Sequence, residues 1–262
     1  MKTRLSIGLV AIGLFAVIYG VSQSIPHSSQ QESNNTMTIQ TVNGKAQYPD
    51  GYQGTPRRAP EEDPFLSPSN CALILIDYQP HILLGVRNVP HEDLMNNTIG
   101  LVKSAVNFNI PIIFSHVGVG LRGADPFLEQ LTKWAPNAII IDRTNVNAWE
   151  EEEFIAAVKA TGRKKLIMAG LWTDVCLAYP AIEAQAAGFQ VHVPEDTVGS
   201  ITQLSHENGM KRMIQAGVRP LTWNVVLAEL QRDHARKESE EGTTRIFLEH
   251  LFKLDPDKGW DQ

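Results

Sequence analysis

The sequence predicts a three-layer, doubly wound α/β domain in which about six parallel strands carry helices on both faces. Three observations predict it: short unbroken apolar runs, helical periodicity in the gaps between them, and a globular composition. The chain has 262 residues, of which 43% are hydrophobic, 20% charged and 7% aromatic. This composition excludes disordered, collagen-like and disulfide-stapled classes of protein.

The strands are predicted from runs of apolar residues, which are typical of strands buried on both faces of a parallel sheet. Six such runs are Ala72–Ile76, Ile110–Phe114, Ala138–Ile141, Leu166–Ala169, Gln190–Val193 and Val218–Leu221. In the first gap, one helical face is formed by Leu94, Thr98, Leu101, Val102 and Ala105. Strands that alternate with helices are parallel, so ligands are expected beyond the carboxyl ends of the strands.

The first 64 residues differ from this domain. Lys2 and Arg4 precede an uncharged apolar run at residues 5–21, and the pattern in 1–24 predicts a signal peptide. A retained N-terminal membrane anchor is the alternative. Residues 25–64 are polar and predict a linker or extended arm, followed by the folded domain at 65–255. We therefore expect an exported protein, either periplasmic or secreted, or one anchored to the membrane by residues 5–21.

Charge and cysteine content exclude further classes. Twenty-nine acidic and 23 basic residues give a net charge of −6, so nucleic acid is not an expected partner. The two cysteines, Cys71 and Cys176, form no CxxC pair. Cys71 opens the first strand and Cys176 follows the end of the fourth, so about 20 Å of strand separates them. A disulfide between them is not expected, and Cys71 is interpreted as a buried structural thiol.

Three residues with complementary chemistry follow predicted strands: Asp77, Arg143 and Cys176. Alone, each has a structural interpretation, as a turn cap, a solvated cation and a small core residue. Because strand ends meet at one rim, the three together predict a site. Cys176 is expected at the start of a helix, where unpaired N–H groups lower a thiol pKa and can also bind an oxyanion.

These residues resemble the isochorismatase-like cysteine hydrolases, over roughly Asp63–Trp223. The resemblance rests on Ala72–Gln79, which holds the acid, and on Leu166–Cys176, which holds the nucleophile. The segments Asp142–Trp149 and His206–Met213 look most like the YcaC-like branch of that family.

The resemblance implies a metal-independent amidohydrolase-type enzyme that cleaves a C–N bond of a small molecule. Cys176 would form an acyl-enzyme and Asp77 would move the proton, while the usual lysine is replaced by Arg143, which cannot exchange protons. A cis Leu171–Trp172 bond and an oxyanion hole of the Trp172 and Cys176 N–H groups are also implied. The alternative is a catalytically silent relative that binds a ligand or builds an assembly. Ester or ether hydrolysis has less support, because the isochorismatases themselves lack the cysteine.

Other side chains are candidates for binding the small-molecule substrate: Gln79, His116, Asn147, Trp149, Trp172 and Thr173. For Asn147 a turn or helix cap is the favoured interpretation, and the tryptophans are core residues at least as often as pocket residues. Nicotinamidases of the family bind a metal through Asp-x-His, whereas Phe114-Ser115-His116 keeps one ligand, so neither a metal nor another cofactor is expected. A homo-oligomer is expected from the family. A C-terminal helical face with Ile246, Phe247, His250 and Leu251 is expected to cover its own subunit or a neighbour.

Overall fold

The structure is a computed structural model that describes residues 40–42, 45–49 and 51–258. It divides into two compact units, Met1–Asp50 and Gly51–Gln262. In the first unit, β1 (Gln40–Val42) pairs antiparallel with β2 (Lys45–Gln47). The predicted leader lies outside the described residues. Within the described ranges, no helix has the length and apolar character needed to cross a membrane.

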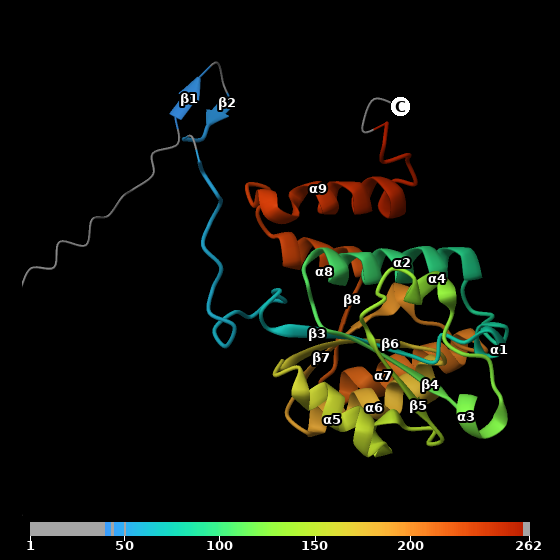
Figure 1. Cartoon of the computed structure of the whole chain (residues 1–262). Helices are drawn as coiled ribbons and strands as arrows, with labels where there is room; N and C mark the ends of the chain where they lie inside the picture. Colours follow the sequence, from blue (N-terminus) through green and yellow to red (C-terminus); the bar gives the residue numbers. More distant parts are fainter. Residues whose placement is uncertain (1–39, 43–44, 50, 259–262) are drawn as a thin grey trace, which may run out of the picture. The chain divides into compact units, whose positions relative to one another are not determined.

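The second unit is built on a six-stranded sheet in which every neighbouring pair is parallel (Figure 1). The order is β5-β4-β3-β6-β7-β8. The strands are β3 (Cys71–Ile76), β4 (Ile112–Val117), β5 (Ile139–Arg143), β6 (Lys165–Gly170), β7 (Gln190–Pro194) and β8 (Arg219–Leu221). The predicted fold class is confirmed.

Burial along the strands explains where the prediction was accurate. The two central strands, β3 and β6, are buried over their full length and coincide with predicted apolar runs to within one residue. β4 begins two residues later than predicted and continues to Val117. The carboxyl end of this strand includes Ser115 and His116, two polar residues that a search for apolar runs cannot include.

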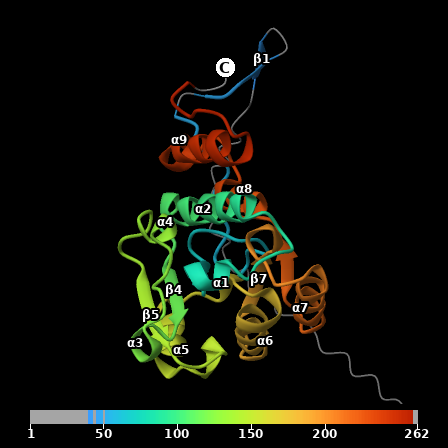
Figure 2. The same cartoon turned by 90° about the vertical axis from the view of Figure 1, so that its right-hand side faces the viewer.

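Helices cover both faces of the sheet (Figure 2). One face carries α2 (His91–Asn107) and α8 (Trp223–Gln231), with α9 (Lys237–Ile246) outside them; the other carries α5 (Glu152–Ala160), α6 (Ala178–Ala186) and α7 (Gln203–Gln215). Shorter elements are α1 (Pro80–Leu83), α3 (Val119–Arg122), α4 (Glu129–Thr132), the 3-10 turns η1 (Ala148–Glu150) and η3 (Glu195–Thr197), and the π-helical turns η2 (Thr173–Leu177) and η4 (Phe247–Leu251).

The C-terminal appendage covers the back of its own subunit. Asn107 of α2 donates to the Ser239 carbonyl at 3.0 Å, and the Lys103 ammonium lies 2.6 Å from the Glu249 carboxylate. Ile246 and His250 are buried as predicted, but Leu248 is buried in place of Leu251. The chain continues from α9 as a π-helical turn, which rotates the later side chains relative to a regular α-helix.

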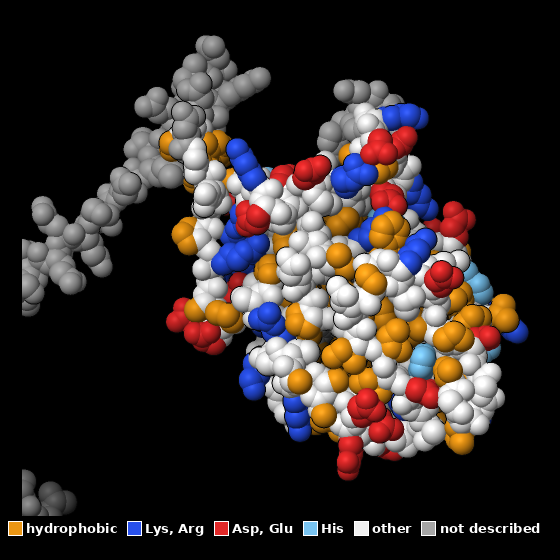
Figure 3. Space-filling model, viewed as in Figure 1, with side chains coloured by type: hydrophobic (Ala, Val, Ile, Leu, Met, Phe, Trp, Pro, Cys, Tyr) orange, Lys and Arg blue, Asp and Glu red, His pale blue; other side chains and the backbone are white. Residues whose placement is uncertain are grey.

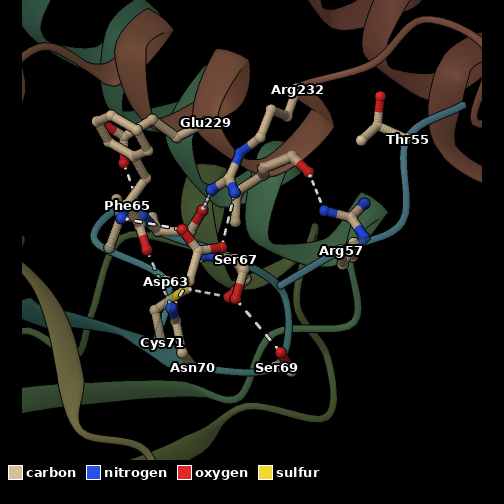
Figure 4. Close-up of polar contacts among 12 residues, drawn as sticks. Thr55, Arg57, Asp63, Phe65, Ser67, Ser69, Asn70, Cys71, Glu229 and Arg232 are labelled. Carbon is tan, nitrogen blue, oxygen red and sulfur yellow. Dashed lines mark hydrogen bonds and ion pairs between the residues drawn. The ribbon is translucent and has the colours of Figure 1, made fainter. Parts of the chain in front are cut away.

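The end of the predicted arm is docked on the same unit (Figure 4). The N–H of Thr55 donates to the Asp233 carboxylate at 2.6 Å, and Arg57 donates to the carbonyl of Leu230 at 2.8 Å. Asp63 is buried and pairs with Arg232 at 2.6 Å. Residues 51–64 are therefore fixed to the C-terminal end of α8, which lies at the amino ends of the strands.

Candidate active site

The predicted site lies where chain connections leave the sheet toward opposite faces. After β3 the chain passes to α2 on one face, and after the neighbouring β6 it passes to α6 on the other. Such a switch point opens a crevice beyond the carboxyl ends of the two strands. Asp77 directly follows β3, and Cys176 lies in η2, the turn between β6 and α6.

Asp77 and Arg143 form a buried, bidentate ion pair. Arg143 Nη1 donates to Asp77 Oδ1 at 2.7 Å and Nη2 donates to Oδ2 at 2.7 Å, and neither side chain is exposed. Arg143 is the last residue of β5 and reaches across β4, where its Nη1 lies 3.3 Å from Ser115 Oγ. Such a clamp fixes both oxygens of a carboxylate. Ser115 was missed from the sequence, because a serine at a strand end has no distinguishing pattern.

Cys176 is half-buried against this pair. Its thiol donates a hydrogen bond to the Asp77 carboxylate, and the backbone N–H of Trp172 faces its sulfur. The Leu171–Trp172 peptide bond is cis, as the resemblance implies. The structure thus brings together all three residues predicted as catalytic, with the amide of the predicted oxyanion hole beside them.

The pKa of Cys176 is raised, whereas the sequence predicted that it would be lowered. Burial, followed by the charge and the hydrogen bond of Asp77, raises the pKa of Cys176 to about 12, and Arg143 and the Trp172 amide offset this only in part. The sequence predicted a lowered pKa from a helix start. The nucleophile turn, η2, does lead into helix α6, but Cys176 is half-buried there beside the Asp77 carboxylate, so the resting group at neutral pH is a neutral thiol next to a carboxylate.

The side-chain amide of Gln79 makes hydrogen bonds within the protein. Its side chain is fully buried, its Oε1 accepts from the Val117 N–H at 3.0 Å, and its Nε2 donates to the Asp125 carbonyl at 2.6 Å. The amide therefore ties the end of β4 to the loop that follows, and its contact with a substrate stays a prediction.

Asn147 and Trp149 also have partners within the protein. Asn147 Oδ1 caps η1 by accepting from the Trp149 N–H at 3.1 Å, and its Nδ2 donates to Glu183 at 2.8 Å. The Trp149 ring packs edge-on against Phe154 and Phe189 in the core. These contacts agree with the cap and core interpretations of the two residues, and their contact with a substrate stays a prediction.

Trp172 and Thr173 flank the nucleophile turn differently. Trp172 is half-buried, and its indole Nε1 donates to the Ile82 carbonyl at 3.0 Å, so its ring lies over the segment after β3. Thr173 is fully buried and its hydroxyl lies 3.0 Å from Nδ1 of His206. Trp172 therefore remains a candidate for substrate contact, whereas the hydroxyl of Thr173 faces the protein interior.

His116 lies close to the ion pair of Asp77 and Arg143. It is buried, its Nε2 is 3.7 Å from Asp142, and its Nδ1 has no partner among the described residues. Burial lowers the pKa of His116 more than Asp142 and Asp77 raise it, so the ring is neutral at pH 7. In the described part of the chain, no three His, Cys, Asp or Glu side chains are grouped to hold a metal ion. Since Phe114 replaces the aspartate, these residues do not fit the metal site of the nicotinamidases.

Comparisons with known proteins agree with this fold. The isochorismatase domain family matches residues 71–225. Probable hydrolase YcaC of Escherichia coli K12 is 36% identical over 188 residues, which cover 71% of this chain and 88% of that protein. The crystal structure of the E. coli YcaC product, an octameric hydrolase of unknown specificity, superposes with a TM-score of 0.69 at 35% identity over 73% of this chain and 93% of that one.

A second solved structure is YcaC from Pseudomonas aeruginosa with hexane-2,5-diol and covalent acrylamide. It has a TM-score of 0.69 and 34% identity, and covers 72% of this chain and 93% of its own. The family match spans more than half of the chain, and the relatives are matched over most of their length. The chain therefore belongs to the isochorismatase family.

Proposed function

We propose that this protein is a cysteine hydrolase of the amidohydrolase type, which cleaves a C–N bond of a small molecule through an acyl-enzyme on Cys176. One observation carries the proposal: the Cys176 thiol donates to a carboxylate, Asp77, whose two oxygens are both held by Arg143. A nucleophile with a general base oriented by a third group is the arrangement that acyl transfer requires.

In the first half-reaction, the proton of Sγ passes to Asp77 while the sulfur attacks the amide carbon. The new S–C bond places a negative charge on the carbonyl oxygen, and the N–H groups of Trp172 and Cys176 are proposed to stabilise it. The C–N bond then breaks, and the nitrogen takes the proton from Asp77 and leaves as an amine. Because the resting thiol is neutral, proton transfer accompanies attack.

In the second half-reaction, Asp77 removes a proton from water, and the oxygen attacks the thioester carbon. The C–S bond breaks, the sulfur regains the proton from Asp77, and a carboxylic acid is released. Arg143 keeps its own proton throughout, since a guanidinium stays charged. Its role is to hold the carboxylate in place, and Asp77 alone carries the proton in both steps.

The test is a screen of small-molecule amides for amine release by the full protein, with the intact mass of the protein followed during turnover. We expect an acyl adduct on Cys176 and loss of turnover by about 10⁴-fold or more in Cys176→Ala. Cys71→Ala, which removes the other thiol, is the matched control and should keep turnover. If no amide is hydrolysed and Cys176 reacts with iodoacetamide no faster than Cys71, the protein is instead a silent ligand-binding or assembly protein.

We also propose that the protein forms a homo-oligomer. The sheet ends at β5, where the edge residues Ile139 and Ile140 are 50% and 49% exposed, and apolar side chains reach the surface among charged ones (Figure 3). Exposed apolar side chains on an edge strand are unfavourable unless a partner covers them. The octameric E. coli YcaC supports this assignment. Light scattering of the wild type and of Ile139→Lys tests it: a monomeric wild type contradicts it.

Export remains a proposal that rests on the sequence of residues 1–24. Fractionation of cells that express the full chain tests it, with the N-terminus of the product read by mass spectrometry. Product in the cytosol with an intact N-terminus would contradict export. An intact N-terminus in the membrane fraction would support the anchor.

A further inference from the structure

A chain of polar contacts leads from Glu195, whose side chain is 49% exposed, through the buried His206 to the nucleophile turn. The Thr173 hydroxyl lies 3.0 Å from His206 Nδ1, and His206 Nε2 lies 3.4 Å from Glu195 Oε1. Thr173 is 0% and His206 is 7% exposed. Thr173 begins η2, the turn that contains Cys176, whereas His206 lies on α7 and Glu195 on η3.

Helix α7 touches the same turn with its backbone. A Cβ built on Gly209, three residues after His206, would lie 2.7 Å from Cα and 2.8 Å from N of Asp174. Only a glycine permits this approach, which brings α7 against the peptide that joins Thr173 to Asp174. The contact and the hydrogen bond between Thr173 and His206 therefore fix the start of the nucleophile turn together.

The direction of the hydrogen bond follows from Glu195. A carboxylate beside Nε2 favours the tautomer with its proton on Nε2, so that Nδ1 keeps its lone pair. Nδ1 then accepts from the Thr173 hydroxyl. A buried hydroxyl that loses its acceptor costs about 1–3 kcal/mol, which is enough to rearrange a turn.

We propose that His206 is a positioning residue, which through the Thr173 hydroxyl holds the turn so that the Cys176 thiol meets the Asp77 carboxylate. The functional readout of this role rests on the hydrolase activity proposed above, but its chemical readout does not. When the acceptor on His206 is removed, the turn relaxes and the sulfur moves away from Asp77. The rate of proton transfer falls steeply with such a displacement.

The experiment compares pairs of variants that differ in one hydrogen-bonding atom. His206→Asn keeps an amide near the position of Nδ1, whereas His206→Leu is apolar and similar in size; Thr173→Ser keeps the hydroxyl, whereas Thr173→Val removes it. Glu207→Gln, on the next residue of α7, is the control, since that carboxylate lies 3.4 Å from Lys211 on the surface. The variants are made in the full chain, and their thermal unfolding is recorded.

The chemical readout is the pH dependence of iodoacetamide labelling at Cys176, followed by peptide mass spectrometry. Because Asp77 raises the pKa of Cys176, separation from it should move labelling to lower pH in His206→Leu and Thr173→Val. His206→Asn and Thr173→Ser should label like the wild type. With an amide substrate, kcat should fall about 10- to 100-fold in His206→Leu and in Thr173→Val, with KM unchanged.

Two outcomes separate this inference from the proposed function. If the labelling profiles shift as expected but no amide is hydrolysed, the positioning role stands and the proposed hydrolase function fails. If His206→Leu and Thr173→Val lower the unfolding temperature but label with the wild-type profile, His206 serves stability alone and the inference is wrong. Should both variants fail to fold, a labelling profile of His206→Asn shifted to that of a free thiol would overturn it equally.

Discussion

The two ends of the sheet hold the same three kinds of side chain in different arrangements. The carboxyl end has Cys176, Asp77 and Arg143, and the amino end has Cys71, Asp63 and Arg232 (Figure 4). Both aspartates are buried and paired with their arginines, at 2.7 Å and 2.6 Å. Burial first of all raises the pKa of each thiol to about 12. Neither the ion pair nor the thiol pKa therefore distinguishes the candidate active site from the structural cluster at the amino end of the sheet.

The difference lies in what each thiol faces. Cys176 donates to the Asp77 carboxylate, which can take its proton. Cys71 donates to the backbone carbonyl of Ser67 at 3.1 Å, which cannot act as a base at neutral pH. Asp63 instead accepts from Arg232 and from the Phe65 N–H at 3.1 Å. A nucleophile is thus identified by its acceptor rather than by its acidity.

The sharpest test of this comparison replaces each aspartate by asparagine. In Asp77→Asn, amide hydrolysis should fall by about 10²–10⁴-fold, because the general base is lost while the shape is kept. In Asp63→Asn, the hydrolysis rate per folded molecule should stay within about twofold, because Asp63 touches no residue of the site. Steady-state kinetics on both variants measures this. A large loss in Asp63→Asn would show that the two ends are coupled.

Removal of each arginine should destabilise the protein unequally. Arg143→Ala leaves a carboxylate buried without a partner, and we expect it to lower the free energy of unfolding by about 3–5 kcal/mol. The Arg232 side chain is 25% exposed, so water can replace part of its pairing and Arg232→Ala should cost roughly 1–3 kcal/mol. Urea unfolding of both variants and of Arg143→Lys gives the ranking. Equal losses would contradict the difference in burial.

The two thiols should respond differently to a neighbouring charge. Burial is the main cause of the raised pKa of Cys176, and the charge and hydrogen bond of Asp77 add to it, so Asp77→Asn should lower this pKa while burial keeps it above the ~8.5 of a free thiol. Asp63→Asn should leave the pKa of Cys71 high, since burial is its main cause. Iodoacetamide labelling of each cysteine against pH tests both. In Asp77→Asn, Cys176 would then be labelled faster and amides would be hydrolysed more slowly. Because loss of structure would also expose this half-buried thiol, the comparison requires that the variant unfolds at the wild-type temperature.

Much of this arrangement followed from the sequence, because buried parallel strands are continuous apolar runs and their carboxyl ends share a rim. That reasoning located Asp77, Arg143 and Cys176. It failed where the outcome depends on contacts between distant segments. The direction of the Cys176 pKa depends on how deeply the turn is buried beside Asp77, and helix periodicity carries no such information.

The amino end of the sheet was not predicted for the same reason. Asp63 and Arg232 are 169 residues apart, and neither stands in a pattern that indicates the other. Gln79 and Asn147 were taken as substrate contacts because amides near a strand end suit either role. Only the positions of their partners decide that one ties a loop and the other caps a turn.

The smallest expected effect is on the stability of the folded protein at low pH, through Asp63 at the amino end of the sheet. Burial raises the pKa of Asp63, but hydrogen bonds from Arg232 and Phe65 and the charges of Arg232 and Lys165 outweigh it, so the net pKa is lowered. The folded state then binds this proton more weakly than the unfolded state, whose carboxyl has a pKa near ~3.9. The stabilisation is therefore complete above that pH and is lost as the pH falls through the folded-state pKa.

Asp63→Asn should consequently be less stable than the wild type at neutral pH and should lose less stability as the pH is lowered from about 4 to about 2. Urea unfolding across this range measures the difference, with Asp93→Asn as the control, because Asp93 makes an exposed pair with Lys253 at 3.1 Å. If the wild type and Asp63→Asn lose stability in parallel, the Asp63–Arg232 pair contributes packing but no charge stabilisation. The two ends of the sheet would then differ in electrostatics as well as in proton transfer.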